Sequence, residues 1–273
     1  MSGPTIRTQI ACTKCGYDLE GLEAQAKCPE CAQDILVTLA ARLDPATESL
    51  ERTRALVRMA WGAYLACVGS VLGCAVAAPP ILGFALDSVA VPAWLAPGLR
   101  GAQSIAPVLA VAGTLIGLVG LGIVLPWERR RAILRARIVG GAGFAGWGVI
   151  ALSTPSFDAA LATLGAIAAV VAALTPLLRE LVPYSRMYRS ARHATQTTRD
   201  LLVAAAATLG TGAVALSLAR TAPGNREVIL LASVGAYGSA MFLLVGLCYR
   251  LANVHWALRS VRRPPPKVDE VLR

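Results

Sequence analysis

Six long apolar segments constrain the fold of this chain more than any other feature. They cover approximately residues 59–78, 105–125, 138–154, 159–178, 201–219 and 229–249. A helix that crosses the hydrocarbon core of a bilayer needs about 20 apolar residues. The chain is also only 15% charged, whereas a soluble domain carries about 25% charged residues. The sequence therefore predicts an all-α polytopic membrane protein with six transmembrane helices.

The segment 138–154 decides the topology. It is short and rich in glycine, and it lies between Arg137 and Pro155. If this segment did not cross the membrane, the orientation of everything after it would be inverted. Six crossings place both termini on the same side.

The distribution of basic residues predicts which side that is. With six crossings, only Arg100, Arg220 and Arg226 of the 26 Lys and Arg residues lie on the side opposite the termini. Cytoplasmic loops of membrane proteins carry the excess of Lys and Arg. We therefore expect a multi-pass protein of the cytoplasmic (inner) membrane, embedded in the lipid bilayer, with both termini in the cytoplasm. This rule also accounts for the net charge of +10, so the charge does not indicate specific nucleic-acid binding.

The sequence divides the chain into four parts. Residues 1–34 form a polar segment with four cysteines, and residues 35–58 form an amphipathic helical linker. Residues 59–250 form the transmembrane domain, and residues 251–273 form a tail whose end we expect to be disordered. Within the transmembrane domain, the connection 79–103 is apolar and interrupted by prolines. We expect it to lie at the membrane interface as a connector, or to dip part-way into the bilayer.

Glycines recur at helical spacing inside the apolar segments. Such residues let helix backbones approach closely in membranes. The glycines that we expect at helix contacts are Gly69, Gly73, Gly113, Gly117, Gly140, Gly143 and Gly146.

The polar N-terminal segment contains two Cys-x-x-Cys pairs, Cys12 with Cys15 and Cys28 with Cys31. Four thiolates in a tetrahedral arrangement suit Zn²⁺ or iron. Disulfides are rare in the cytoplasm. We therefore expect these four cysteines to bind one structural zinc ion, with iron as the alternative. Cys67 and Cys74, in the first apolar segment, are interpreted as small apolar residues.

Residues beside these cysteines fit a compact metal site. Gly16 suits a left-handed turn, and Pro29 stiffens the second Cys-x-x-Cys turn. Lys14 and Lys27 can offset the formal charge of −2 on zinc with four thiolates. Residues 16–27 can form a short hairpin with Gly21 near its tip. A segment with so few apolar residues would need the metal for folding, which supplies on the order of 10 kcal/mol.

The stretch CTKCGYDLEGL followed by CPEC resembles the short N-terminal zinc ribbon of uncharacterised bacterial multi-span membrane proteins. Their pattern is CxxCGYDLxGL, then CPxCG. The matching residues are Cys12, Cys15, Gly16, Tyr17, Asp18, Leu19, Gly21, Leu22, Cys28, Pro29 and Cys31. Ala32 stands where the pattern has glycine, and the likeness covers about a tenth of the chain. The resemblance implies a small zinc-ribbon module of β-hairpin knuckles and implies no reaction.

The paired cysteines are also similar to those of rubredoxin, which hold one iron for electron transfer. The gap between the pairs is shorter here, and the aromatic residues that surround rubredoxin's iron are missing. This resemblance implies a membrane-tethered electron carrier as a lesser alternative.

Three functions remain open from the sequence. The first is a membrane scaffold or accessory subunit whose zinc module docks a protein partner on the cytoplasmic side. The second is a transporter or channel for an apolar or lipid-like substrate, because the six segments contain none of the charged residues that ion-coupled transport uses. The third is the electron carrier. We expect no enzyme, since no set of catalytic residues stands out.

Overall fold

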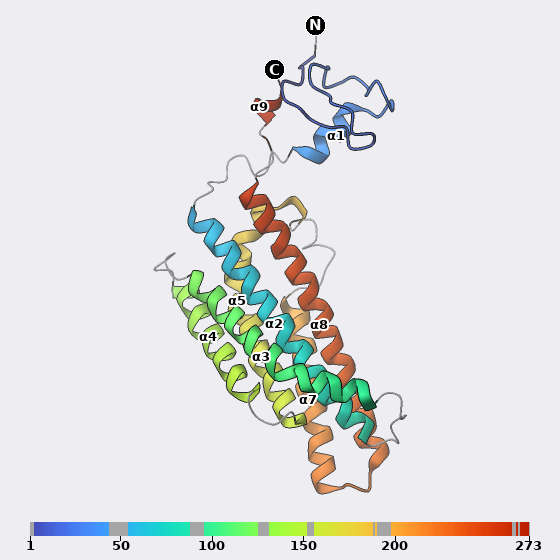
Figure 1. The fold of residues 1–273 in the computed structure, drawn as a ribbon, viewed down its shortest axis with the longest axis vertical. Helices are drawn as coiled ribbons and strands as arrows, with labels where there is room; N and C mark the ends of the chain where they lie inside the picture. Colours follow the sequence, from blue (N-terminus) through green and yellow to red (C-terminus); the bar gives the residue numbers. More distant parts are fainter. Residues whose placement is uncertain are drawn as a thin grey trace.

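The computed structural model describes residues 3–43, 54–87, 96–124, 131–151, 156–187, 189, 198–263, 266 and 268–272. Long helices form an elongated bundle, and a small module made from the N-terminal residues lies beyond one end of it (Figure 1). The two chain termini lie close together in this module. We call residues 3–43 together with 268–272 the cysteine module. The end of the bundle with Arg54, Leu181 and Arg262 is the module end.

Six long helices account for the six apolar segments. They are α2 (Arg54–Asp87), α3 (Ala96–Ile123), α4 (Arg131–Ala151), α5 (Phe157–Leu181), α7 (Thr198–Thr221) and α8 (Arg226–Arg262). A short 3-10 helix, η3 (Val182–Tyr184), continues α5. Two short helices belong to the cysteine module, α1 (Ile35–Arg42) and α9 (Val268–Val271).

Five of the six long helices in the described residues are long and apolar enough to cross a membrane, so this is a helical membrane protein. The exception is α4, which carries Arg131, Arg135 and Arg137 in its first two turns. The structure thus shows the third apolar segment as a helix but not as a span in its own right. Six spans were expected, and five of the described helices qualify.

The expected connector at 79–103 is helical over most of its length, whereas the sequence suggested an irregular segment interrupted by prolines. Helix α2 continues through Pro79 and Pro80 to Asp87, and α3 already begins at Ala96. A proline inside a helix removes a hydrogen-bond donor, but membrane helices tolerate it where neighbouring helices satisfy the freed groups. Residues 88–95 lie outside the described residues. Pro176 likewise lies inside α5, which continues to Leu181.

Helix α2 lies at the centre of the bundle and contributes to both of its buried clusters. One cluster, toward the module end, joins α2 to α3, α4, α5 and α8 through residues such as Met59, Trp147 and Leu174. The other joins α2 to α5, α7 and α8 through Ile81 and Leu164. Large apolar side chains such as Val108, Val149 and Leu231 are more than two-thirds exposed, which suits helices that face lipid.

Glycines bring α2 and α3 into backbone contact. A Cβ atom added to Gly69 would lie 2.7 Å from the Gly113 carbonyl oxygen, and one added to Gly117 would lie 2.4 Å from the Phe144 ring. Gly73, Gly113 and Gly143 are similarly confined by Ile167, Trp147 and Val170, and a Cβ atom added to Gly140 would lie 3.1 Å from Leu121. A Cβ atom added to Gly146 would meet nothing within 4 Å, so the expectation that it lies at a close helix contact is wrong. Gly62 and Gly120 also join α2 and α3, although their spacing in the sequence did not predict it.

Two aromatic residues of α4 fill the space that these glycines leave. Phe144 lies against Gly69 and Gly117, while Trp147 lies against Gly73 and Gly113. Both aromatic side chains are almost fully buried. These contacts hold α4 in the bundle despite its three arginines.

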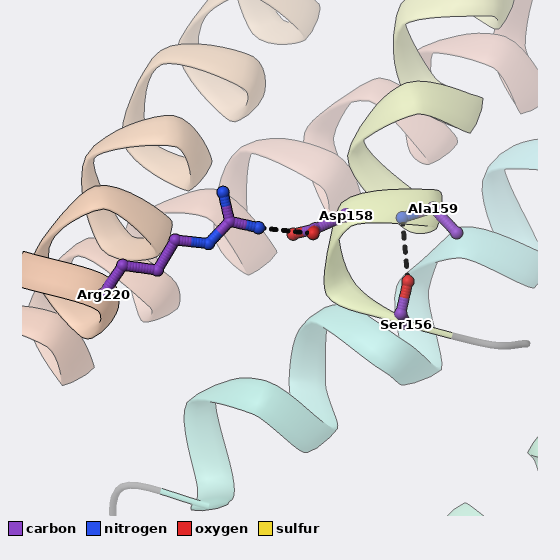
Figure 2. Close-up of polar contacts among 4 residues, drawn as sticks. All are labelled: Ser156, Asp158, Ala159 and Arg220. Carbon is purple, nitrogen blue, oxygen red and sulfur yellow. Dashed lines mark hydrogen bonds and ion pairs between the residues drawn. The ribbon is translucent and has the colours of Figure 1, made fainter.

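The start of α5, at the end of the bundle far from the module, is capped by side chains (Figure 2). The Ser156 hydroxyl accepts a hydrogen bond of 3.1 Å from the Ala159 N–H, as helix N-cap serines do. Arg220, near the end of α7, pairs with Asp158 at 2.7 Å. Both of these side chains are more than half exposed, so the pair stabilises the fold by about 1 kcal/mol at most.

Aromatic residues gather near the module end. The Trp61 and Tyr64 ring centroids of α2 are 6.0 Å apart, and His255 of α8 lies 5.9 Å from Tyr64. The Arg262 guanidinium lies 5.5 Å from the Trp61 ring. Trp and Tyr are enriched at membrane interfaces, so an aromatic cluster of this kind is typical of the end of a membrane-spanning bundle.

The C-terminal residues are ordered against the N-terminus, which corrects the expectation of a disordered end. Helix α8 continues to Arg262, and α9 places Val271 in the core of the cysteine module with no exposed surface. The Arg7 N–H donates to the Val271 carbonyl oxygen at 2.8 Å. An antiparallel bridge also joins Ile6 to Leu272.

Candidate metal centre

The cysteine module is built from two copies of one backbone pattern. The Cys12 N–H donates to the Tyr17 carbonyl, and the Cys28 N–H donates to the Gln33 carbonyl, both at 2.8 Å. The Gly16 N–H donates to the Cys12 carbonyl and the Ala32 N–H to the Cys28 carbonyl. Equivalent residues are 16 positions apart in every case. Each copy is therefore a tight turn that presents a Cys-x-x-Cys pair.

The repeat continues beyond each turn into the core. The Leu19 N–H donates to the Ile10 carbonyl, and the Ile35 N–H donates to the Ala26 carbonyl, both at 3.0 Å. Leu19 and Ile35 are both fully buried. Isolated bridges, Ala11 to Asp18 and Lys27 to Asp34, join the sides of each turn. The described residues contain no β-strand, so the expected β-hairpin form of the module is not found.

Each turn requires a residue with a positive φ angle after its second cysteine. Gly16 has a φ of 79°, the left-handed conformation that the sequence predicts. Its counterpart Ala32 has a φ of 56°. Left-handed backbone costs a residue with a Cβ atom about 1–2 kcal/mol. Gly21 is also left-handed, with a φ of 82°, between the two turns.

The two turns bring all four cysteine sulfurs together. The Sγ atoms of Cys12, Cys15, Cys28 and Cys31 all lie within 4.8 Å of one another. Sγ of Cys12 is 3.7 Å from Sγ of Cys31, and Sγ of Cys15 is 3.6 Å from Sγ of Cys28. Tetrahedral zinc with Zn–S bonds of about 2.3 Å separates its sulfurs by about 3.8 Å. The four residues therefore fit one tetrahedral metal ion.

The backbone favours thiolate formation at one of these cysteines. The N–H groups of Cys15 and then Lys14 donate to the Cys12 sulfur and lower the pKa of Cys12 to about 6. At Cys15 the Tyr17 N–H acts in the same direction. Lost hydration and hydrogen bonds with the other three thiols outweigh it and raise the pKa of Cys15 to about 12. Like charges this close oppose one another, so a bound cation is what would allow all four thiols to ionise.

Helix α1 closes the site from one side through Thr38. This side chain is fully buried, and its hydroxyl lies 4.0 Å from the Cys12 sulfur. It also accepts a hydrogen bond from the Thr13 N–H at 3.3 Å. The Gln33 amide donates to the Thr13 hydroxyl at 2.8 Å, which joins the two turns.

The other residues expected beside the metal lie on the outside of the module. Lys14 donates to the Cys31 carbonyl at 3.5 Å. Lys27 and Pro29 are exposed beside Cys28. Cys67 and Cys74 are buried in the bundle, as expected for small apolar residues, and the Cys74 thiol donates to the Ala240 carbonyl of α8.

The module has a larger apolar core than the sequence analysis expected. Among the apolar residues between the two cysteine pairs, Leu19 is buried and Leu22 packs against the core, whereas Tyr17 is 39% exposed. Residues on both sides of the cysteine segment complete the core: Ile6, Ile10, Ile35, Leu39, Leu43 and Val271. Helix α1 thus packs within the module, although the sequence groups it with the linker. Residues 44–53 of that linker lie outside the described residues.

One of the core residues outside the cysteine segment could have been predicted from a repeat in the sequence. Both turns are followed by an acidic and then an aliphatic residue, Asp18–Leu19 and Asp34–Ile35, at the same distance from the cysteines. Aligning the two halves with this offset of 16 identifies Ile35 as the partner of Leu19. Thr38 and Val271 carry no comparable signal, because their role depends on tertiary packing.

Comparison with known proteins gives no match among family models, curated proteins or solved structures.

Proposed function

We propose that this protein is an integral membrane scaffold or accessory subunit whose zinc-bound module docks a protein partner in the cytoplasm. The observation that carries the proposal is a pair of exposed apolar residues on the module. Leu36 and Val37 of α1 are each 54% exposed. Their neighbours Ile35, Thr38 and Leu39 are buried in the module, so α1 has no freedom to turn the exposed pair inward.

The metal centre supports a binding role rather than catalysis. Structural zinc sites are closed by four protein ligands, whereas catalytic sites keep a position open for water or substrate. Four sulfurs within 4.8 Å of one another fill all positions of a tetrahedral ion. Zinc then holds the two turns and α1 as a rigid support for Leu36 and Val37. The resemblance to the zinc ribbon of bacterial multi-span proteins is part of this proposal.

The partner surface that fits is apolar and carries basic residues. The described N-terminal residues 3–43 carry more carboxylates than basic side chains. The carboxylates are Asp18, Glu20, Glu23, Glu30 and Asp34, and the basic residues are Arg7, Lys14, Lys27 and Arg42. A four-thiolate zinc site adds two further negative charges. Charge complementarity of this kind steers association and orients partners.

Photocrosslinking in cells tests the docking. A photoreactive amino acid in place of Leu36 should give one discrete protein adduct, and the same substitution at Thr8, which is exposed elsewhere on the module, should not. Adding Cys28→Ser should abolish the adduct because the module unfolds. Equal adducts at the two positions, or an adduct that persists in Cys28→Ser, would contradict the proposal.

We also propose that α4 crosses the membrane, which places six crossings between two cytoplasmic termini. The packing of Phe144 and Trp147 between α2 and α3 supports this placement. Thr8→Cys, in the cysteine module, and Gly224→Cys, between α7 and α8, are at exposed positions and test it. In spheroplasts, an impermeant maleimide should label only Gly224→Cys. Labelling of Thr8→Cys from outside would exclude this orientation.

A further inference from the structure

A basic pocket lies between the cysteine module and the module end of the bundle. It has a volume of about 900 Å³. The module contributes Arg42 and Gln9, and the bundle contributes Trp256 and Ser260. Three more arginines complete the charged lining: Arg186, Arg259 and Arg263. The two parts touch here, because the Arg186 guanidinium donates to the Ala40 carbonyl at the end of α1.

All the charged side chains that line this pocket are basic. No Asp or Glu is among its lining residues. The ion pair of Arg220 with Asp158 lies at the other end of the bundle. Four guanidinium groups around one space repel one another. Such a cluster is stabilised when an anion enters, and the planar fork of arginine binds phosphate oxygens in pairs.

The level of the pocket along the bundle indicates where such an anion would come from. Trp256 lies about 45 Å along α8 from Arg226 at 1.5 Å per residue. A bilayer with its headgroups is about 40–45 Å thick. The aromatic cluster of Trp61, Tyr64 and His255 lies at the same end of the bundle. The pocket therefore lies at the headgroup level, open to both lipid phosphates and soluble phosphates.

We propose that this pocket binds a phosphate group, supplied by an anionic phospholipid headgroup or by a soluble phosphate compound. The group would contact Arg42 on the module and Arg259 and Arg263 on the bundle. It would thereby hold the module against the membrane domain. This binding function is separate from the metal site and from the docking of a partner.

The test uses the full-length protein, purified in detergent and stripped of lipid. The variant Arg259→Gln/Arg263→Gln removes two of the four charges from exposed positions. Arg262→Gln is the matched control, because Arg262 is on the same helix but lies over Trp61 rather than in the pocket. One arm titrates inorganic phosphate by calorimetry. The other measures retention of phosphatidylglycerol against phosphatidylcholine by native mass spectrometry.

We expect binding of at least one probe to the wild type and to Arg262→Gln, and binding about tenfold weaker or worse to the double variant. Selective loss of phosphatidylglycerol would identify a lipid headgroup, and selective loss of inorganic phosphate would identify a soluble ligand. If neither probe binds the wild type, or if Arg262→Gln loses as much binding as the double variant, the proposal is wrong.

Discussion

Ala32 shows how a single residue limits the stability of the metal site. It occupies the same place in the second turn that Gly16 occupies in the first, and both have positive φ angles. Glycine adopts this conformation without the steric cost that a Cβ atom imposes. The sequence already indicates this position, since Ala32 replaces the glycine of the CPxCG pattern. The structure adds the backbone angle that makes the replacement unfavourable.

Ala32→Gly should therefore stabilise the cysteine module by about 1 kcal/mol. Thermal unfolding of the module, followed by release of the metal, measures this effect. Ala11→Gly is the matched control, because Ala11 is exposed and does not have a positive φ angle. That control should be neutral or destabilising. Stabilisation by both substitutions, or by neither, would contradict the assignment of strain to Ala32.

Thr38 is the residue whose role the sequence does not reveal. It lies on the buried side of α1 among aliphatic residues, and only the fold brings its hydroxyl to the Thr13 N–H and the Cys12 sulfur. Thr38→Val keeps the shape and removes the hydroxyl. Loss of a hydrogen bond beside a metal ligand lowers metal affinity by about tenfold or more.

Competition with a coloured zinc chelator measures that change. Thr38→Ser keeps the hydroxyl and should retain most of the wild-type affinity. An unchanged affinity in Thr38→Val would show that the hydroxyl does not support Cys12.

At the scale of helices, the packing of α4 explains what hydropathy alone cannot predict. Its arginines lower its apolar character, so it is not among the five helices that qualify as spans. Phe144 and Trp147 nevertheless fill spaces over glycines of α2 and α3. Of the seven glycines expected at helix contacts, six have a close neighbour from another helix. The prediction from the spacing was wrong at Gly146, because periodicity identifies a helix face without showing whether another helix covers that face.

Gly69→Ala tests the close contact between α2 and α3. The added Cβ atom would meet the Gly113 backbone oxygen at 2.7 Å, and backbone cannot move aside as a side chain can. We expect a loss of about 1–3 kcal/mol in stability, seen as a lower Tm in detergent. Gly146→Ala should leave the Tm unchanged, since nothing lies within 4 Å of that position. Equal effects of the two substitutions would refute this account of the packing.

At the scale of the whole molecule, the chain closes on itself at the cysteine module. The core of the module includes Val271 near the C-terminus, and it is separate from the two clusters of the bundle. The composition of the tail does not predict this arrangement. A short segment after three prolines has the same composition whether or not it packs against the module. Each end of the chain is therefore needed to complete one small domain.

Val271→Asp should detach the tail, since burying an ionised carboxylate in an apolar core costs several kcal/mol. Hydrogen exchange at the Arg7 amide measures the detachment of the tail directly, because that N–H donates to the Val271 carbonyl. We expect the Arg7 amide to lose protection while the amides of α2 and α8 keep theirs. Asp269→Asn, at an exposed position of the same helix, should change neither. Retained protection in Val271→Asp would show that the tail does not hold the module together.

We propose that the four cysteines hold one zinc ion that folds the module. This is tested by the metal content and visible spectrum of the full-length protein purified in detergent, compared with Cys28→Ser. We expect one zinc per chain and no colour in the wild type, and no bound metal in Cys28→Ser. One iron per chain with a visible charge-transfer band would instead indicate an electron carrier. A wild-type protein without metal, with four freely reactive thiols in the module, would contradict the account.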